Sequence, residues 1–397
     1  MGIKRRDFIQ AAGLTALTAA ASTAASAAGI TGRPGKNGFG QKYGTSHTQK
    51  PFDPLNEQGI HPILMSDHPY TFIDSCMQIW PDASFADAHR YGVTCLTLTA
   101  WNPHDTFDKA LEGLMFWHFI ARKYPHLPIV YSVADITRAK EQKNSALLLA
   151  SQCGDFIGYE LHRIEAFYRL GLRLLIPAYS LSNHICGGCL DVTDGGLTSF
   201  GREVVKECNR VGLLLDCSHL GRRSSLDIIE RSRNPVVFSH SCTKVVADNP
   251  RNIDDTQIKS CAAGGGIIGL SPWGPMVLKT GKKKRPTVDD FIDHIDHTAQ
   301  LLGSVDHIGI GTDMSLGTYP DHEHDPWGGP VYKDVTGTYD THITNNIRSP
   351  QRMVDGFSFY AEVLNFADRL KARGYREPDI HKILGGNYLR VFTKVWE

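Results

Sequence analysis

The sequence has no net charge, no internal repeat and no glycine-rich phosphate loop. Its 42 basic and 42 acidic residues cancel, which argues against nucleic acid or a charged membrane surface as a partner. A doubly wound nucleotide-binding sheet needs a glycine-rich turn after its first strand, and the segment 74–78, Asp-Ser-Cys-Met-Gln, is not one. With 397 residues, 41% of them hydrophobic, the chain is long enough to bury a full core, so we expect an enzyme-sized globular protein.

The N-terminal segment has the pattern of an export signal. Residues 4–8, Lys-Arg-Arg-Asp-Phe, open an Ala- and Thr-rich stretch that ends in Ala-Ser-Ala at 25–27. This is typical of a twin-arginine signal with a small-residue cleavage site, and its side chains are too small for a stable membrane anchor. We therefore predict a signal peptide at 1–27, an extended lead at 28–55 and a single domain at 56–397. The twin-arginine export machinery would be a partner, and the mature protein would be periplasmic.

From about residue 72 onward, short apolar runs alternate with longer amphipathic ones. The amphipathic runs predict helices, among them those at 200–211 and 288–302. The apolar runs predict eight core strands, near residues 72–77, 93–99, 146–152, 173–178, 212–217, 235–239, 265–270 and 306–312. Eight strand–helix units make an α/β fold of the (β/α)8 TIM type, so we predict one barrel of this kind.

Two histidines follow predicted strands that are consecutive in the chain. His219 ends the sequence Asp-Cys-Ser-His after the apolar run 213–215, and His240 lies in Ser-His-Ser after the run 236–238. Because a helical stretch at 222–233 separates them, both imidazoles should lie at the carboxyl ends of adjacent barrel strands. Two histidines placed in this way can hold one metal ion. The alternative for each residue is a hydrogen-bonded core histidine.

The nine cysteines are an odd number, so at least one is unpaired within the chain. Cys186 and Cys189 are separated by two glycines, a spacing that suits a redox pair or half of a zinc knuckle. Because the chain has no matching second pair, we interpret these two residues as a local loop disulfide.

From about residue 72 to 392, the sequence resembles the renal (membrane) dipeptidase family, the M19 metallopeptidases, which have amidohydrolase-type barrels of the metal-dependent hydrolase kind. The strongest parts of the resemblance are Gly196–Gly201, Asp216–His219, Ser239–Ser241, Arg251–Asn252 and Ile308–Asp313. The resemblance implies that His219 and His240 bind one zinc ion of a two-zinc site. It also implies that Arg251, eleven residues after His240, binds the substrate carboxylate and that Asp313 serves catalysis.

The first half of the family's site is replaced in this sequence. Where members carry His-x-Asp at the end of strand one, this chain has Cys76, Met77 and Gln78, and Gln152 occupies the place of the bridging glutamate. Two dications a few ångström apart need a bridging carboxylate to offset their repulsion, and a neutral amide supplies no such charge. We therefore predict a single zinc ion, with a metal-free site as the alternative.

The third ligand of a one-zinc site would be Cys76, with Gln152 and Cys153 as weaker candidates. Thiolate suits zinc well at this position. The alternative for Cys76 is a small buried residue that fills the space left by a lost ligand.

Asp313 would carry the catalytic proton, and Tyr179, at the place of a family histidine that helps to bind the reacting carbonyl, would donate a hydrogen bond to the oxyanion. Arg251 would bind an anionic substrate group, with Asn183 and His184 beside it. The alternatives are a surface ion pair of Arg251 with Asp254 or Asp255, a helix cap for Asp313, and ordinary packing for Tyr179.

The leading hypothesis is an exported dipeptidase-like metallohydrolase that cleaves a dipeptide or a related N-acyl amino acid. One alternative is a barrel enzyme with a non-hydrolytic role, such as isomerisation or maturation of an exported peptide-derived metabolite. Another is a metal-free carboxylate-binding protein. The family's tendency to form dimers points to a homodimer, which the sequence itself leaves open.

Overall fold

The computed structural model of the protein describes residues 67–80, 83–86, 88–317 and 352–397. The predicted signal at 1–27 and the predicted lead at 28–55 lie outside these residues. None of the helices in the described ranges combines the length and the apolar character needed to cross a membrane.

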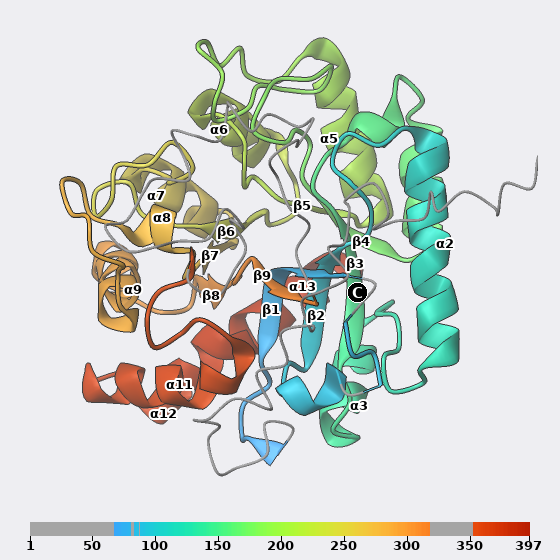
Figure 1. The fold of residues 1–397 in the computed structure, drawn as a ribbon. Helices are drawn as coiled ribbons and strands as arrows, with labels where there is room; N and C mark the ends of the chain where they lie inside the picture. The colour runs from blue at the N-terminus through green and yellow to red at the C-terminus, as the bar shows by residue number, and fades with distance from the viewer. Residues whose placement is uncertain (1–66, 81–82, 87, 318–351) are drawn as a thin grey trace, which may run out of the picture.

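Parallel strands form a barrel-like sheet with helices around it (Figure 1). Neighbouring strands follow the order β5-β4-β3-β2-β1-β8-β7-β6, and a single parallel bridge between Asp216 and Val237 joins the two ends of this path. The strands are β1 (Ile73–Ile79), β2 (Cys95–Thr99), β3 (Ala146–Ser151), β4 (Leu172–Leu175), β5 (Leu214–Leu215), β6 (Val237–Ser241), β7 (Ile267–Leu270), β8 (Ile308–Ile310) and β9 (Met314–Leu316), which pairs with β1. The predicted (β/α)8 barrel is confirmed, and each predicted strand overlaps an observed one.

The strands read as continuous apolar runs because they are covered on both faces. In β3, the sequence Ala-Leu-Leu-Leu-Ala-Ser is buried at every position, so no alternation of apolar and polar residues is seen. One face of such a strand fills the barrel interior and the other packs under helices. Full burial of a leucine side chain stabilises the folded state by about 1.5–3 kcal/mol. The apolar runs therefore determine which segments form the buried strands.

The helix ends are set by capping residues, as α9 (Val288–Leu302) shows. Thr287 begins this helix in a capping box with Asp290, and Gly303, at a φ of 66°, ends it in the left-handed conformation that favours glycine. The observed bounds agree with the predicted ones. The other α-helices of the described residues are α2 (Phe107–Lys123), α3 (Val133–Glu141), α4 (His162–Arg169), α5 (Ser199–Val211), α6 (Arg222–Arg231), α7 (Asp255–Ala263), α8 (Gly274–Val277), α11 (Val363–Ala372), α12 (Glu377–His381) and α13 (Asn387–Trp396).

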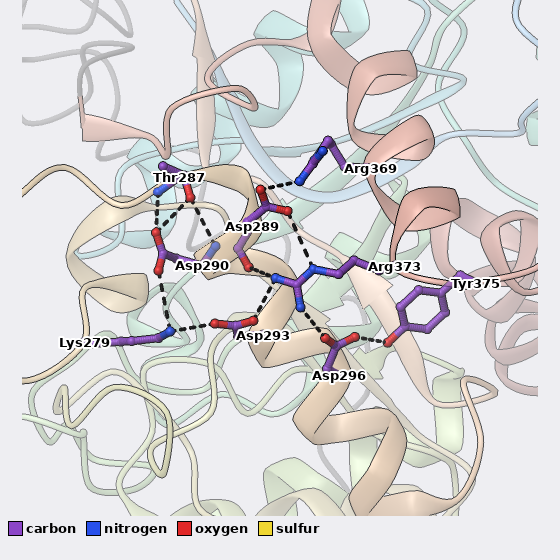
Figure 2. A network of polar contacts seen from close by, with 9 residues as sticks. All are labelled: Lys279, Thr287, Asp289, Asp290, Asp293, Asp296, Arg369, Arg373 and Tyr375. Carbon is purple, nitrogen blue, oxygen red and sulfur yellow. Dashed lines mark hydrogen bonds and ion pairs between the residues drawn. The ribbon is translucent and has the colours of Figure 1, made fainter.

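An ionic network fastens the segment around α11 to α9 (Figure 2). Arg373 donates hydrogen bonds to Asp296 at 2.7 Å, to Asp293 at 2.9 Å and to the backbone carbonyl of Asp289 at 2.9 Å. Arg369 forms an ion pair with Asp289. Because one guanidinium serves several acidic groups, its removal would leave carboxylates of α9 facing one another. The network thus holds the C-terminal helices against the helix that precedes β8.

Candidate active site

His219 and His240 lie together at the carboxyl ends of β5 and β6, as their sequence context predicts. Their Nε2 atoms are 2.9 Å apart, and the two side chains are almost fully buried, with residues 5% and 1% exposed. Each Nδ1 atom has a hydroxyl partner at 2.7 Å, Ser180 for His219 and Ser239 for His240. The Nε2 atoms of the two rings therefore point toward each other, while hydrogen bonds to the Nδ1 atoms fix the orientation of the rings.

Asp216 explains why the sequence Asp-Cys-Ser-His produces this geometry. Its buried carboxylate accepts the backbone N–H of Ser218 at 2.9 Å and that of Ser239, on the next strand, at 3.0 Å. Ser218 in turn accepts the backbone N–H of His240 at 3.1 Å. Burial raises the pKa of Asp216, although the serine hydrogen bonds oppose the shift. These bonds join the ends of β5 and β6 and fix the distance between the two histidines.

The histidine pair fits a metal ion of the zinc class. The two Nε2 atoms point toward the same position, and each Nδ1 atom has a hydrogen-bond partner. Histidines that bind a metal through one ring nitrogen normally form a hydrogen bond through the other, so the pair has this arrangement. Ser180 and Ser239 are the hydrogen-bond partners of the Nδ1 atoms. The sequence motif Ser-His-Ser is the signal that could have indicated Ser239.

Two of the predicted third ligands, Cys76 within β1 and Gln152 just after β3, are in contact with each other. The Gln152 amide donates to the Cys76 sulfur at 3.4 Å and to Thr99 Oγ1 at 2.8 Å, and the Cys76 sulfur lies 4.0 Å from Asp313 Oδ1. Sequence reasoning thus brings Cys76, Gln152 and Asp313 to one place, as the structure does. The role of Cys76 or Gln152 as a metal ligand stays a prediction.

Asp313 occupies a bulge between β8 and β9. Asp74 pairs with Ile310 and Met77 pairs with Met314, so three steps along β1 face four steps along the opposite strand. The extra residue interrupts the ladder, and Asp313 has a φ of 56°, which is uncommon for a residue other than glycine. Such bulges redirect a side chain, and here the Asp313 carboxylate lies beside Cys76 of β1 rather than capping a helix.

A buried carboxylate that sequence reasoning missed supports this bulge. Asp74 accepts hydrogen bonds from the Thr312 N–H at 2.8 Å, from the Thr312 hydroxyl at 2.5 Å and from the Tyr360 hydroxyl at 2.8 Å. Burial raises the pKa of Asp74 to about 7. Asp74 therefore fixes the residue immediately before Asp313. Its place two residues before Cys76, directly ahead of the replaced part of the family motif, is the signal that could have indicated it.

Arg251 lines a cavity beside the histidine pair. The residue is 4% exposed and its Nη2 donates to the His240 carbonyl at 3.1 Å. The cavity, of about 440 Å³, is also lined by His219 and has room for a small molecule. The surface ion pair considered as an alternative is not what the structure shows, because Asp254 pairs with Arg222 at 2.5 Å and Asp255 with His297 at 2.8 Å.

Tyr179 stacks on His219, with ring centroids 4.1 Å apart and an angle of 27° between the planes. This contact places the phenol next to the histidine pair, where a substrate carbonyl could meet it. His184 instead packs against Tyr159 and Phe200, with ring centroids 5.1 and 5.6 Å away, near the start of α5. The predicted roles of Tyr179 and His184 remain predictions.

The amide of Asn183 is used within the protein. Its Nδ2 donates to Asp155 at 2.8 Å and to the Pro177 carbonyl at 2.9 Å, while its Oδ1 accepts the N–H groups of Ile185 and Cys186. An amide has two donor and two acceptor positions, so all of them are occupied. Any contribution of Asn183 to substrate binding would come through the loop conformation that these bonds hold.

The expected disulfide between Cys186 and Cys189 is wrong, because both residues are thiols in the structure. Cys186 is buried in the hydrophobic core, whereas Cys189 lines the cavity next to Arg251. The loop therefore sends the two sulfur atoms into different surroundings.

A parallel barrel with polar side chains gathered at the carboxyl ends of its strands is the architecture of a TIM-barrel enzyme. The sequence model for "Membrane dipeptidase (Peptidase family M19)" matches residues 79–325. The chain therefore belongs to the membrane dipeptidase family, and the resemblance found in the sequence is confirmed. It is a dipeptidase-like hydrolase.

Relatives and solved structures agree with this assignment. The chain is 26% identical over 304 residues to an uncharacterized protein in the pqqA 5′ region of Klebsiella pneumoniae, covering 74% of this chain and 99% of that protein. It is 29% identical over 308 residues to Dipeptidase 3 of Rattus norvegicus, covering 75% of this chain and 55% of that protein. The chain thus spans about half the length of Dipeptidase 3.

Two solved structures share the fold. An amidohydrolase from Pseudomonas aeruginosa matches with a TM-score of 0.71 and 30% identity, over 84% of this chain and 98% of that chain. A metallo peptidase from Rhodobacter sphaeroides, liganded with a phosphinate mimic of the dipeptide L-Ala-D-Ala, matches with a TM-score of 0.66 and 19% identity, over 83% of this chain and 100% of that chain.

Proposed function

We propose that the protein is an exported hydrolase that cleaves a dipeptide or a related N-acyl amino acid, with one zinc ion held by His219 and His240. The observation that carries the proposal is the convergence of the two Nε2 atoms, 2.9 Å apart, beside a cavity lined by the buried Arg251. Export to the periplasm rests on the N-terminal sequence, and the substrate class rests on the family and on the guanidinium in the cavity.

Three residues have separate roles in the proposed reaction. Arg251 binds the substrate carboxylate through its planar guanidinium, which the bond to the His240 carbonyl holds in place. Asp313 accepts the proton of the attacking water and later returns it to the leaving nitrogen. Tyr179 donates a hydrogen bond to the oxyanion that forms on the reacting carbonyl. A zinc ion, when bound, would lower the pKa of a water molecule to about 7 and polarise that carbonyl.

The test combines metal content with dipeptide hydrolysis. His240→Ala should lower the zinc content by one ion per chain and remove turnover, because one of two converging imidazoles is lost. Asp313→Asn should keep the metal but lower kcat about 10²–10⁴-fold, the range expected when a proton carrier is removed. His184→Ala is the control, because its ring packs against Tyr159 and Phe200, and it should keep the metal. Retained turnover in Asp313→Asn would contradict the proposed proton transfer.

A non-hydrolytic reaction is the second candidate, and one observation favours it. At the place of the family's bridging glutamate, the Gln152 amide hydrogen-bonds to Cys76 and Thr99 instead of providing a negative charge. A protein that binds zinc through His219 and His240 but cleaves neither dipeptides nor N-acyl amino acids would support this candidate over hydrolysis. If the protein takes up no metal at these histidines, both the zinc-dependent hydrolysis and the zinc-dependent non-hydrolytic reaction are excluded. The remaining candidate is then a metal-free carboxylate-binding protein.

A further inference from the structure

A second group of metal-ligating side chains lies at the mouth of the barrel. His104 follows β2, and Cys153 and Asp155 follow β3, so all three lie at the same end of the sheet as the histidine pair. His104 Nδ1 is 2.9 Å from Asp155 Oδ2 and 4.0 Å from the Cys153 sulfur. One ligand atom from each residue lies within 4.8 Å of the others, a spacing that no other three His, Cys, Asp or Glu residues reach in the described part of the chain.

The chemistry of the three ligands suits a divalent ion of the zinc class. An imidazole nitrogen, a thiolate sulfur and a carboxylate oxygen are all zinc ligands, and a thiolate with a carboxylate would balance the charge of a dication. Cys153 is fully buried, whereas the side chains of His104 and Asp155 are 36% and 27% exposed. An ion could therefore reach the group from solvent and keep a position open to water.

The carboxylate is already oriented for this role. Asn183 Nδ2 donates to Asp155 Oδ1 at 2.8 Å, which leaves Oδ2 on the side of His104. Burial alone would raise the pKa of Asp155, but the hydrogen bonds from His104 and Asn183 hold it below its ordinary value. Burial raises the pKa of the Cys153 thiol, so a bound cation would be needed to keep this sulfur as a thiolate.

We propose that His104 Nδ1, Cys153 Sγ and Asp155 Oδ2 bind a zinc-class ion in a site separate from the pair formed by His219 and His240. The ion would cross-link the loops after β2 and β3, and Asn183 extends this link to the loop after β4. Tyr179 contacts both sites, since its ring stacks on His219 and meets the His104 ring edge-on at 6.1 Å. This metal needs no bridging carboxylate, so the loss of that group at Gln152 does not prevent it.

The test uses cobalt(II) as the probe, because a thiolate ligand adds a sulfur-to-metal charge-transfer absorption that histidine and carboxylate ligands do not. In His240→Ala, where the histidine pair is broken, one cobalt per chain with this absorption is expected. Adding Cys153→Ser to this variant should remove the absorption and the ion. Adding His104→Ala, a change at a partly exposed side chain, should weaken cobalt affinity about tenfold or more.

Cys189→Ser in the same background is the matched control, because Cys189 lines the cavity beside Arg251 and should leave the absorption unchanged. Absence of bound cobalt in His240→Ala would overturn the proposal, as would an absorption that survives both Cys153→Ser and His104→Ala. The result is independent of hydrolysis: a chain without dipeptidase activity that shows Cys153-dependent cobalt binding would retain this site and lose only the proposed reaction.

Discussion

His294 makes the stability of the protein depend on pH through a single buried ring. Its Nδ1 accepts the Thr243 hydroxyl at 2.8 Å and the Thr243 N–H at 3.1 Å, so the ring must be neutral at this nitrogen. Thr243 lies between His240 and Arg251 in the chain, and it forms a parallel bridge with Ile253, two residues after Arg251. The ring therefore supports the segment that joins a proposed metal ligand to the proposed carboxylate-binding residue.

The expected magnitude follows from the pKa. Burial lowers the pKa of His294 from 6.5 to about 3. The Val277 backbone and the nearby charge of Asp293 oppose the shift, while Lys279 and His297 add to it. The unfolded chain thus binds a proton that the folded chain does not between these two values. The contribution to the free energy of unfolding is fully present above pH 6.5 and is lost as the pH falls toward 3. Between pH 7 and pH 5 the loss is about 2 kcal/mol.

The measurement is urea unfolding at pH 7 and pH 5 with metal removed by a chelator, so that metal binding does not add its own pH dependence. His294→Asn is the comparison, because the amide oxygen can accept from Thr243 but does not titrate. Wild type should lose about 2 kcal/mol more than the variant over this range. Equal losses in the two proteins would refute the buried neutral histidine as the source of the pH dependence.

Three further predictions concern stability and substrate binding. Arg373→Ala should lower the free energy of unfolding by about 1–2 kcal/mol, because carboxylates of α9 lose their shared partner. The control Lys206→Ala removes a lysine from an exposed ion pair and should cause no measurable change. Equal effects of the two substitutions would contradict the network of Figure 2. Gly311→Ala should lower the free energy of unfolding by about 3 kcal/mol or more, since a Cβ there would lie 1.8 Å from a backbone carbonyl of β6. In the control Gly264→Ala, the atom nearest to the new Cβ is 3.5 Å away, so urea unfolding should show a much smaller loss. Arg251→Lys should raise KM for a dipeptide about 10- to 100-fold with a smaller change in kcat, because a bidentate contact is lost, and an unchanged KM would remove Arg251 from the substrate site.

The strands and several helix ends were readable from the sequence because local signals determine them. Strand β3 is a run of apolar residues covered on both faces, and α9 lies between Thr287 and Gly303, which cap it. The family motifs around His219 and His240 are local as well, since each follows its strand directly. Their position at one end of the barrel followed from the parallel topology.

Contacts between distant segments could not be read in this way. Asp74 supports Thr312 across 238 residues, and Cys153 meets His104 across 49 residues. A short buried carboxylate or a cysteine after a strand has the same local sequence pattern whether it packs, supports a loop or binds an ion. Its partner is set by which strands become neighbours and by where a bulge turns the backbone.

The sequence by itself determined the barrel, the family, and the pairing of two histidines at adjacent strand ends, because apolar periodicity and short motifs act over a few residues. Only the tertiary structure decided which groups hold those histidines, how Asp313 is directed toward Cys76 of β1, and that His104 joins Cys153 and Asp155. These features depend on distances between segments that the closure of the sheet brings together, and distances of that kind leave no trace in local composition.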